Sequence, residues 1–195
     1  MTRTRRRRGA VVGALATAAL VAGCGTASGA DDGTEQAGSK RLPRQYPTGS
    51  AEGEYQATLQ LEDGRQVTVR LVEGTGVQER HRASASASWS AWQTLYETDT
   101  DRCQHVELQE VSGTVALTAD FGRFCSDGEP PTESVAGVGT GDLTDWDIDV
   151  TEDFDGWQDT SITDDGTRVV FLYDSDAGLY YQRWGYGTGF EDPVR

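Results

Sequence analysis

The chain has 195 residues with a net charge of −15, from 17 Lys or Arg and 32 Asp or Glu. Five of the basic residues and none of the acidic ones precede Cys24, so the chain from Cys24 onward carries 12 basic and 32 acidic residues, a net charge of −20. This balance argues against nucleic acid as a partner and against membrane attachment through a basic patch, because both need a basic surface.

Residues 1–23 predict a lipoprotein signal peptide. Arginines between positions 3 and 8 precede an apolar run from Ala10 to Ala22, which is shorter than the about 20 apolar residues that a transmembrane helix needs. The run ends in Val21-Ala22-Gly23-Cys24, the apolar, small, small, Cys order of a bacterial lipobox. We therefore expect a lipid on Cys24 and a location at the extracytoplasmic face of the cell membrane. The alternative is an ordinary signal peptide with an incidental cysteine, and the arginines leave both the Sec and the twin-arginine route open.

Residues 24–53 predict a flexible, lipid-anchored linker, because Gly, Ser, Thr, Ala and scattered charges follow one another without apolar periodicity. Such a segment reaches about 30 Å as a random coil. The remaining residues, 54–195, are enough for one domain.

Alternating apolar residues and glycine-rich turns predict a single antiparallel all-β domain over 54–195, with about eight or nine strands in a meander barrel or a sandwich. In the first hairpin the loop at 62–64 places Leu59 opposite Val67. In the second hairpin a Ser112-Gly113 turn places Leu108 opposite Leu117. Two further hairpins turn at Asp165-Gly166 and at residues 174–178.

Cys103 and Cys125 lie at the open end of the second predicted hairpin, outside the cytoplasm if the leader exports the chain. This position predicts a disulfide between them, although the chain must kink near Gly122 to bring the two residues together. Two free buried thiols are the alternative.

Catalytic signatures are absent from the sequence: it contains neither a G-x-S-x-G nor an H-E-x-x-H motif. His81 and His105 are the only histidines. Either could serve a serine together with an acid, but His105, beside Gln104 on a predicted strand, is expected to be a surface or structural residue. The serines that alternate with alanine over residues 83–90 predict the polar face of a strand rather than a cluster of nucleophiles.

Acidic residues gather between Asp142 and Asp165, where Asp145, Asp147 and Asp149 share one face of a predicted strand. A solvated strand face is the simpler interpretation, and a calcium site is the alternative, because calcium binds clustered oxygen ligands. No other cofactor is indicated. The segment 174–178 resembles the start of a calcium-binding loop, but a plain turn is favoured because the twelfth position is Gly185 instead of Glu.

Five tryptophans are many for one domain, and we expect at least three of them to pack in the core. An exposed tryptophan beside carboxylates would suit a module that binds an envelope glycan. The same pair of features would also suit a glycosidase, whose mechanism needs two carboxylates at a defined separation.

Several segments, together with the leader, resemble small actinobacterial, streptomycete-type lipoproteins of unknown function. These segments are Glu97 to Cys103, Ala119 to Gly122, Asp127 to Thr132 and Asp153 to Trp157. The resemblance implies no catalytic or binding residue. The sequence thus predicts a membrane-anchored, non-catalytic domain that binds an envelope protein or glycan, with a hydrolase acting on cell-wall material as the alternative.

Overall fold

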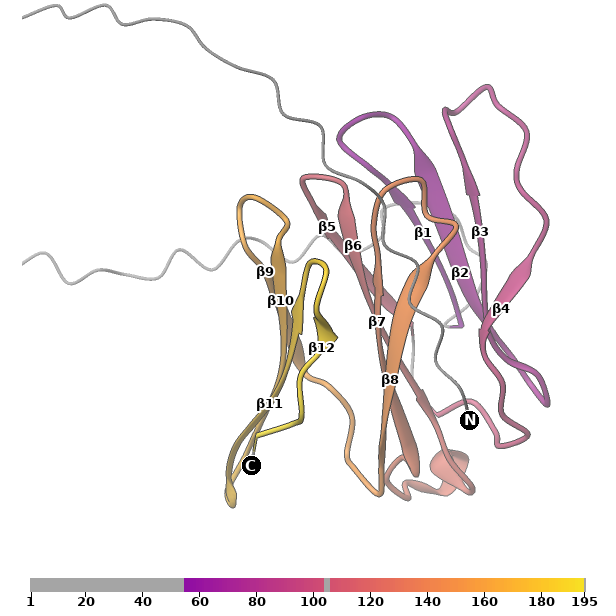
Figure 1. The fold of residues 1–195 in the computed structure, drawn as a ribbon. Helices are drawn as coiled ribbons and strands as arrows, with labels where there is room; N and C mark the ends of the chain where they lie inside the picture. The colour runs from indigo at the N-terminus through magenta and orange to yellow at the C-terminus, as the bar shows by residue number, and fades with distance from the viewer. Residues whose placement is uncertain (1–54, 104–105, 195) are drawn as a thin grey trace, which may run out of the picture. The chain divides into compact units, whose positions relative to one another are not determined.

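In the computed structural model, residues 55–103 and 106–194 form three antiparallel sheets of four strands each (Figure 1). The first sheet contains β1 (Gln56–Gln60), β2 (Gln66–Val72), β3 (Gly76–Arg82) and β4 (Gln93–Tyr96). The second contains β5 (Glu107–Val111), β6 (Thr114–Phe121), β7 (Glu133–Gly139) and β8 (Trp146–Glu152). The third contains β9 (Asp159–Ile162), β10 (Arg168–Ser175), β11 (Gly178–Gly185) and β12 (Gly189–Phe190).

Each sheet is a meander whose strands pair in chain order. The first strands begin at Gln56, Glu107 and Asp159, so the four-stranded unit recurs after 51 and then 52 residues. Strand β5 contacts both β1 and β9, which places the first strands of successive sheets beside one another. The all-β prediction is confirmed, with twelve strands instead of eight or nine.

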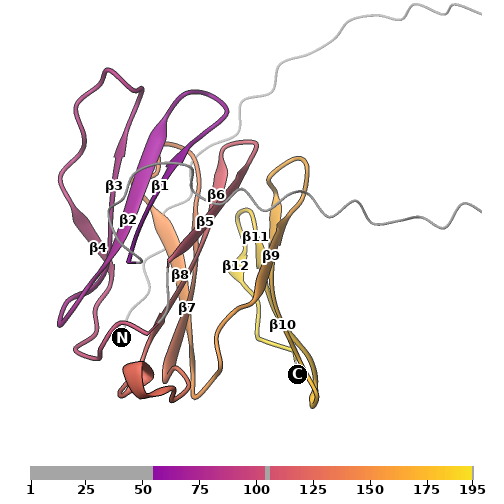
Figure 2. The ribbon, with the colours of Figure 1, turned by 180° about the vertical axis from the view of Figure 1, so that it is seen from behind.

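The sheets are stacked face to face in three layers, and the second sheet lies in the middle in both views (Figures 1 and 2). One apolar cluster joins the first sheet to the second: its members include Val67, Val69, Leu117 and Phe121. A separate cluster joins the second sheet to the third and includes Ala136, Val169, Phe171 and Trp184. Of the two predicted architectures, the sandwich therefore describes the packing, with one layer more than a two-sheet sandwich has.

The middle sheet is buried on both faces. Every residue of β6 is buried, including Thr118 and Asp120, because the residues of alternate parity face the first and the third sheet. Thr114 at the start of β6 donates its hydroxyl to the carbonyl of Gly166 at 2.8 Å, which links the second and third sheets at one end. Its apolar residues, such as Ala116 and Leu117, occur at both parities, as is typical of strands covered on both sides.

The predicted hairpin registers are confirmed where the strands pair: Leu59 opposes Val67, and Leu108 opposes Leu117. Ser112 and Gly113 have φ angles of 51° and 81°, as a two-residue type I′ turn requires. The turn between β10 and β11 is tighter than predicted. Ser175 already pairs with Gly178, so only two residues form the turn and the segment has no room for a calcium-binding loop.

The prediction of a strand over residues 83–90 is wrong, because these residues belong to the loop between β3 and β4. Alternating serine and alanine imitate the two-residue period of a strand, but alanine offers little apolar surface to bury. Ala87 donates its backbone N–H to the carbonyl of Ser84 at 3.0 Å, which makes a local turn. The apolar residues that end this loop, Trp89 and Trp92, pack on the outer face of the first sheet instead.

Candidate functional site

Cys24, the predicted site of lipidation, lies outside the described residues together with the predicted linker 24–53 and His105. Within residues 55–103 and 106–194, no helix is long and apolar enough to cross a bilayer.

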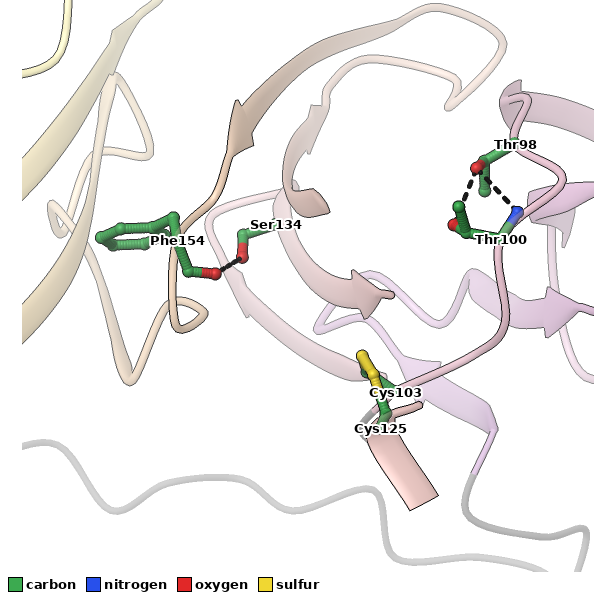
Figure 3. The surroundings of a disulfide bond; sticks show 6 residues. All are labelled: Thr98, Thr100, Cys103, Cys125, Ser134 and Phe154. Carbon is green, nitrogen blue, oxygen red and sulfur yellow. Dashed lines mark hydrogen bonds between the residues drawn. A yellow bond between two sulfur atoms is a disulfide. The ribbon is translucent and has the colours of Figure 1, made fainter. Parts of the chain in front are cut away.

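The predicted disulfide between Cys103 and Cys125 is present, with the two Cα atoms 4.9 Å apart. The predicted kink is produced by Phe124, whose φ is 66°, and by a short 3₁₀ helix, η1, at Cys125–Asp127. Gly122 faces both sulfur atoms, and a Cβ at this position would lie 3.0 Å from each, so the residue leaves room for the bond. Figure 3 shows the disulfide near Thr98, which accepts a hydrogen bond from the backbone N–H of Thr100 at 3.2 Å.

Cys103 and Cys125 line a cleft of about 500 Å³, and a second cleft of about 340 Å³ adjoins it. They share the walls formed by Glu129, Pro130, Pro131 and Asp155. Tyr173 donates its hydroxyl to the Asp155 carboxylate at 2.6 Å, and this bond raises the pKa of Tyr173. Carboxylates outnumber cations in these walls, so the clefts favour cationic over anionic groups.

The acidic strand is β8, and its two faces are those predicted: Trp146, Ile148 and Val150 pack against the first core cluster. On the other face Asp147 accepts a hydrogen bond from the indole N–H of buried Trp184 at 2.6 Å. Asp149 is half-buried, and burial raises the pKa of its carboxyl. The row is thus more than a solvated face, because one of its carboxylates links the second sheet to the third. Among the described residues, no three acidic, histidine or cysteine side chains gather as a metal site would require.

His81 lies on β3 beside a carboxylate and a serine, which is the combination that a hydrolase would need. Its Nδ1 is 2.8 Å from Oε1 of Glu79, whose side chain is fully buried, and burial raises the pKa of Glu79. Ser90, however, accepts the backbone N–H of His81 at 3.0 Å and donates its hydroxyl to the carbonyl of Ala91 at 3.1 Å. The serine oxygen is therefore bonded to main-chain groups, and the imidazole does not activate it in this structure.

Three tryptophans pack in the core, as predicted: Trp157 and Trp184 are buried in the second cluster, and Trp146 packs against the first. The remaining two, Trp89 and Trp92, lie on the outer face of the first sheet. There they alternate with arginines, each guanidinium lying over an indole ring.

We call this group, formed by Arg70, Arg80, Arg82, Trp89 and Trp92, the Trp–Arg face. Arg70 lies 3.9 Å from the centre of the Trp92 ring, and Arg80 lies 4.4 Å from the same ring. Arg80 is also 4.8 Å from the Trp89 ring, whose other neighbour is Arg82 at 4.4 Å. Cation–π contacts therefore run through all five side chains.

Glutamines on neighbouring strands hold the two outer arginines of the Trp–Arg face. Arg70 donates Nε and Nη2 to the side-chain oxygen of Gln78 at 3.1 and 2.8 Å. Arg82 donates in the same way to Gln66, which lies opposite it in the strand pairing. Sequence reasoning missed this face, since nothing in the alternation of residues 83–90 indicates that the loop folds back over the sheet.

Comparison with known proteins adds no relative: no protein-family model matches the chain, and neither the curated proteins nor the solved structures contain a significant match.

Proposed function

We propose that this chain is an exported lipoprotein whose β-domain, residues 54–195, is held at the extracytoplasmic face of the cell membrane by a lipid on Cys24. The domain binds a protein or glycan of the envelope and catalyses no reaction. The observation that carries the proposal is the order of the leader: arginines, an apolar run and Val21-Ala22-Gly23-Cys24. The linker 24–53 gives the domain about 30 Å of reach from the membrane.

The disulfide supports export. Disulfides persist in oxidising compartments and are rare in the cytosol, where thiols are kept reduced. Cys103 and Cys125 are the only cysteines besides Cys24, and they are joined in the folded domain. After lipidation no free thiol would remain, which is the arrangement expected of a chain that folds outside the cytoplasm.

The competing function, hydrolysis of cell-wall material, has one observation in its favour: Glu79 orients the imidazole of His81 as an acid orients the base of a catalytic triad. The nearest candidate nucleophile, Ser90, is held by main-chain groups. A binding function is supported by the Trp–Arg face, a group of stacked and hydrogen-bonded side chains that contains no nucleophile.

Metabolic labelling with a fatty-acid analogue tests the proposal, followed by fractionation of cells into membrane and soluble material. We expect label on the wild-type chain and on Cys103→Ser/Cys125→Ser, because this control removes two thiols and keeps the lipobox. Cys24→Ser should take up no label and leave the membrane fraction or remain unprocessed. Wild-type protein without label in the soluble fraction would contradict the proposal.

A further inference from the structure

The Trp–Arg face concentrates positive charge on a strongly acidic protein. Residues 80–93, which form most of it, contain no Asp or Glu, although the whole chain has 32 acidic residues. Other arginines lie near carboxylates: Arg65 pairs with Asp63, and Arg102 lies 3.5 Å from Glu73. Within the described part of the chain, the three arginines of the Trp–Arg face have no ion pair. Among the described residues, this face therefore gathers three arginines without a carboxylate paired to any of them.

Packing fixes the positions of these cations. Arg80 and Arg82 alternate along β3 and so point to the same face, about 7 Å apart along the strand. Arg70 lies on β2, where its strand partner is Gln78, and it joins the same row through Trp92. Guanidinium groups that are already stacked and bonded lose little conformational entropy when they bind a ligand, so the array is preorganised.

The outer arginines keep hydrogen-bonding capacity for a ligand. A guanidinium group has five N–H donors on three nitrogens. In Arg70 and in Arg82, Nε and Nη2 donate to a glutamine, which leaves the N–H groups of Nη1 for a ligand. All five side chains of the face are half-buried and keep part of their surface in solvent. The polar neighbours Gln66, Gln78 and Thr94 add amide and hydroxyl groups. Such a surface suits a ligand rich in hydroxyl groups that carries negative charges at intervals.

We propose that the Trp–Arg face binds a linear acidic polysaccharide, an inference that rests on the proposed function as an exported binding domain. Carboxylates along the polysaccharide would pair with the three guanidinium groups, and sugar hydroxyls would bond the neighbouring amides. An acidic protein segment fits less well, because extended peptides usually bind along a sheet edge and this array lies on a sheet face. A lipid chain fits less well still, because polar side chains make up most of the surface.

Equilibrium binding of the purified full chain to polygalacturonate in a non-ionic detergent tests this proposal. Neutral dextran and polyglutamate serve as comparison polymers. We expect binding of polygalacturonate at low salt, tighter than that of either comparison polymer, and a loss of at least about tenfold in affinity at 0.5 M salt, because ion pairs at a surface are screened. Tryptophan fluorescence should change on binding, since Trp89 and Trp92 belong to the face.

Arg70→Gln/Arg82→Gln should weaken binding by about tenfold or more, whereas Arg168→Gln/Arg183→Gln should change it less than about twofold. The control pair removes the same charge from exposed positions on β10 and β11. Should the first pair impair folding, Ala91→Glu provides a second test: Ala91 is exposed beside Trp92, and a carboxylate there should weaken binding while the stacked side chains stay intact.

Three results would overturn the proposal: no binding beyond that of dextran, equal loss of affinity in both arginine pairs, or polyglutamate bound as tightly as polygalacturonate. The last result would indicate an acidic protein partner. Fatty-acid labelling reports separately on the proposed function. A chain that is labelled but does not bind polygalacturonate would refute only the proposed polysaccharide ligand. A chain that binds polygalacturonate but is not labelled would refute only the proposed lipid anchor.

Discussion

Replacing Asp147 by asparagine should weaken the link between the second and third sheets. Asp147 accepts the indole N–H of Trp184 at 2.6 Å, and the tryptophan side chain is 3% exposed. Hydrogen bonds to charged groups contribute about 1.5–3 kcal/mol, and neutral ones about 0.5–1.5 kcal/mol. Asparagine keeps a neutral acceptor, and Asp147 is itself exposed even though Trp184 is buried, so we expect a loss of only about 1 kcal/mol. For a domain of this size the melting temperature should fall by roughly 3–5 °C.

Thermal unfolding followed by circular dichroism measures this loss, with Asp145→Asn as the matched control. Asp145 lies on the same face next to β8, carries the same charge and is exposed. Its substitution relieves repulsion among neighbouring carboxylates without removing a bond to an indole. Trp184→Phe, combined with Asp147→Asn, completes a double-mutant cycle, which should give a coupling of about 0.5 kcal/mol or more.

Metal dependence separates this account from the calcium alternative. The loss in Asp147→Asn should be the same in EDTA, calcium and magnesium at matched ionic strength, because the bond to Trp184 involves no metal. A loss that appears only with calcium would show that Asp147 is a metal ligand. Equal stabilities of the Asp147→Asn and Asp145→Asn variants would refute the reasoning from the hydrogen bond.

Two further predictions concern stability. Cys103→Ser/Cys125→Ser should lower the free energy of unfolding by about 3 kcal/mol, because the bond closes a loop across 22 residues. Mass spectrometry of non-reduced wild-type peptides should find the two cysteines joined. Freely alkylated thiols in native protein would contradict this prediction. Burial raises the pKa of Glu79 above its usual 4.5, so the folded state binds the proton more tightly and stability falls as pH rises from 4.5 through the raised pKa. Melting temperatures of Glu79→Gln should therefore rise relative to wild type over that pH range, and a pH-independent difference would contradict the argument.

Local structure was predictable where two signals agreed. In the first two hairpins, the alternation of apolar residues and the position of a turn glycine independently gave the same register, and Leu59 and Leu108 have the predicted partners. The disulfide was predictable because its cysteines flank one hairpin. These features depend on contacts between residues that are near in sequence.

The stacking of the three sheets and the polar contacts between them were not predictable from the sequence, because they depend on residues far apart in the chain. Leu117 and Ala116 are both buried because sheets cover both faces of β6, and a single strand pattern does not say what lies above and below it. The bond between Asp147 and Trp184 joins residues 37 positions apart. The loop that carries Trp89 showed a period of two without the side-chain volume that a strand would bury.

The intact mass and N-terminal sequence of the protein recovered from the membrane fraction test the central claim most directly. Our account predicts a mature chain that lacks residues 1–23, begins at Cys24 and carries the added mass of a diacylglyceryl group on that cysteine. The disulfide between Cys103 and Cys125 should be intact in the same protein. A chain that begins at another residue, or an unmodified Cys24 in a protein that fractionates with soluble material, would contradict it.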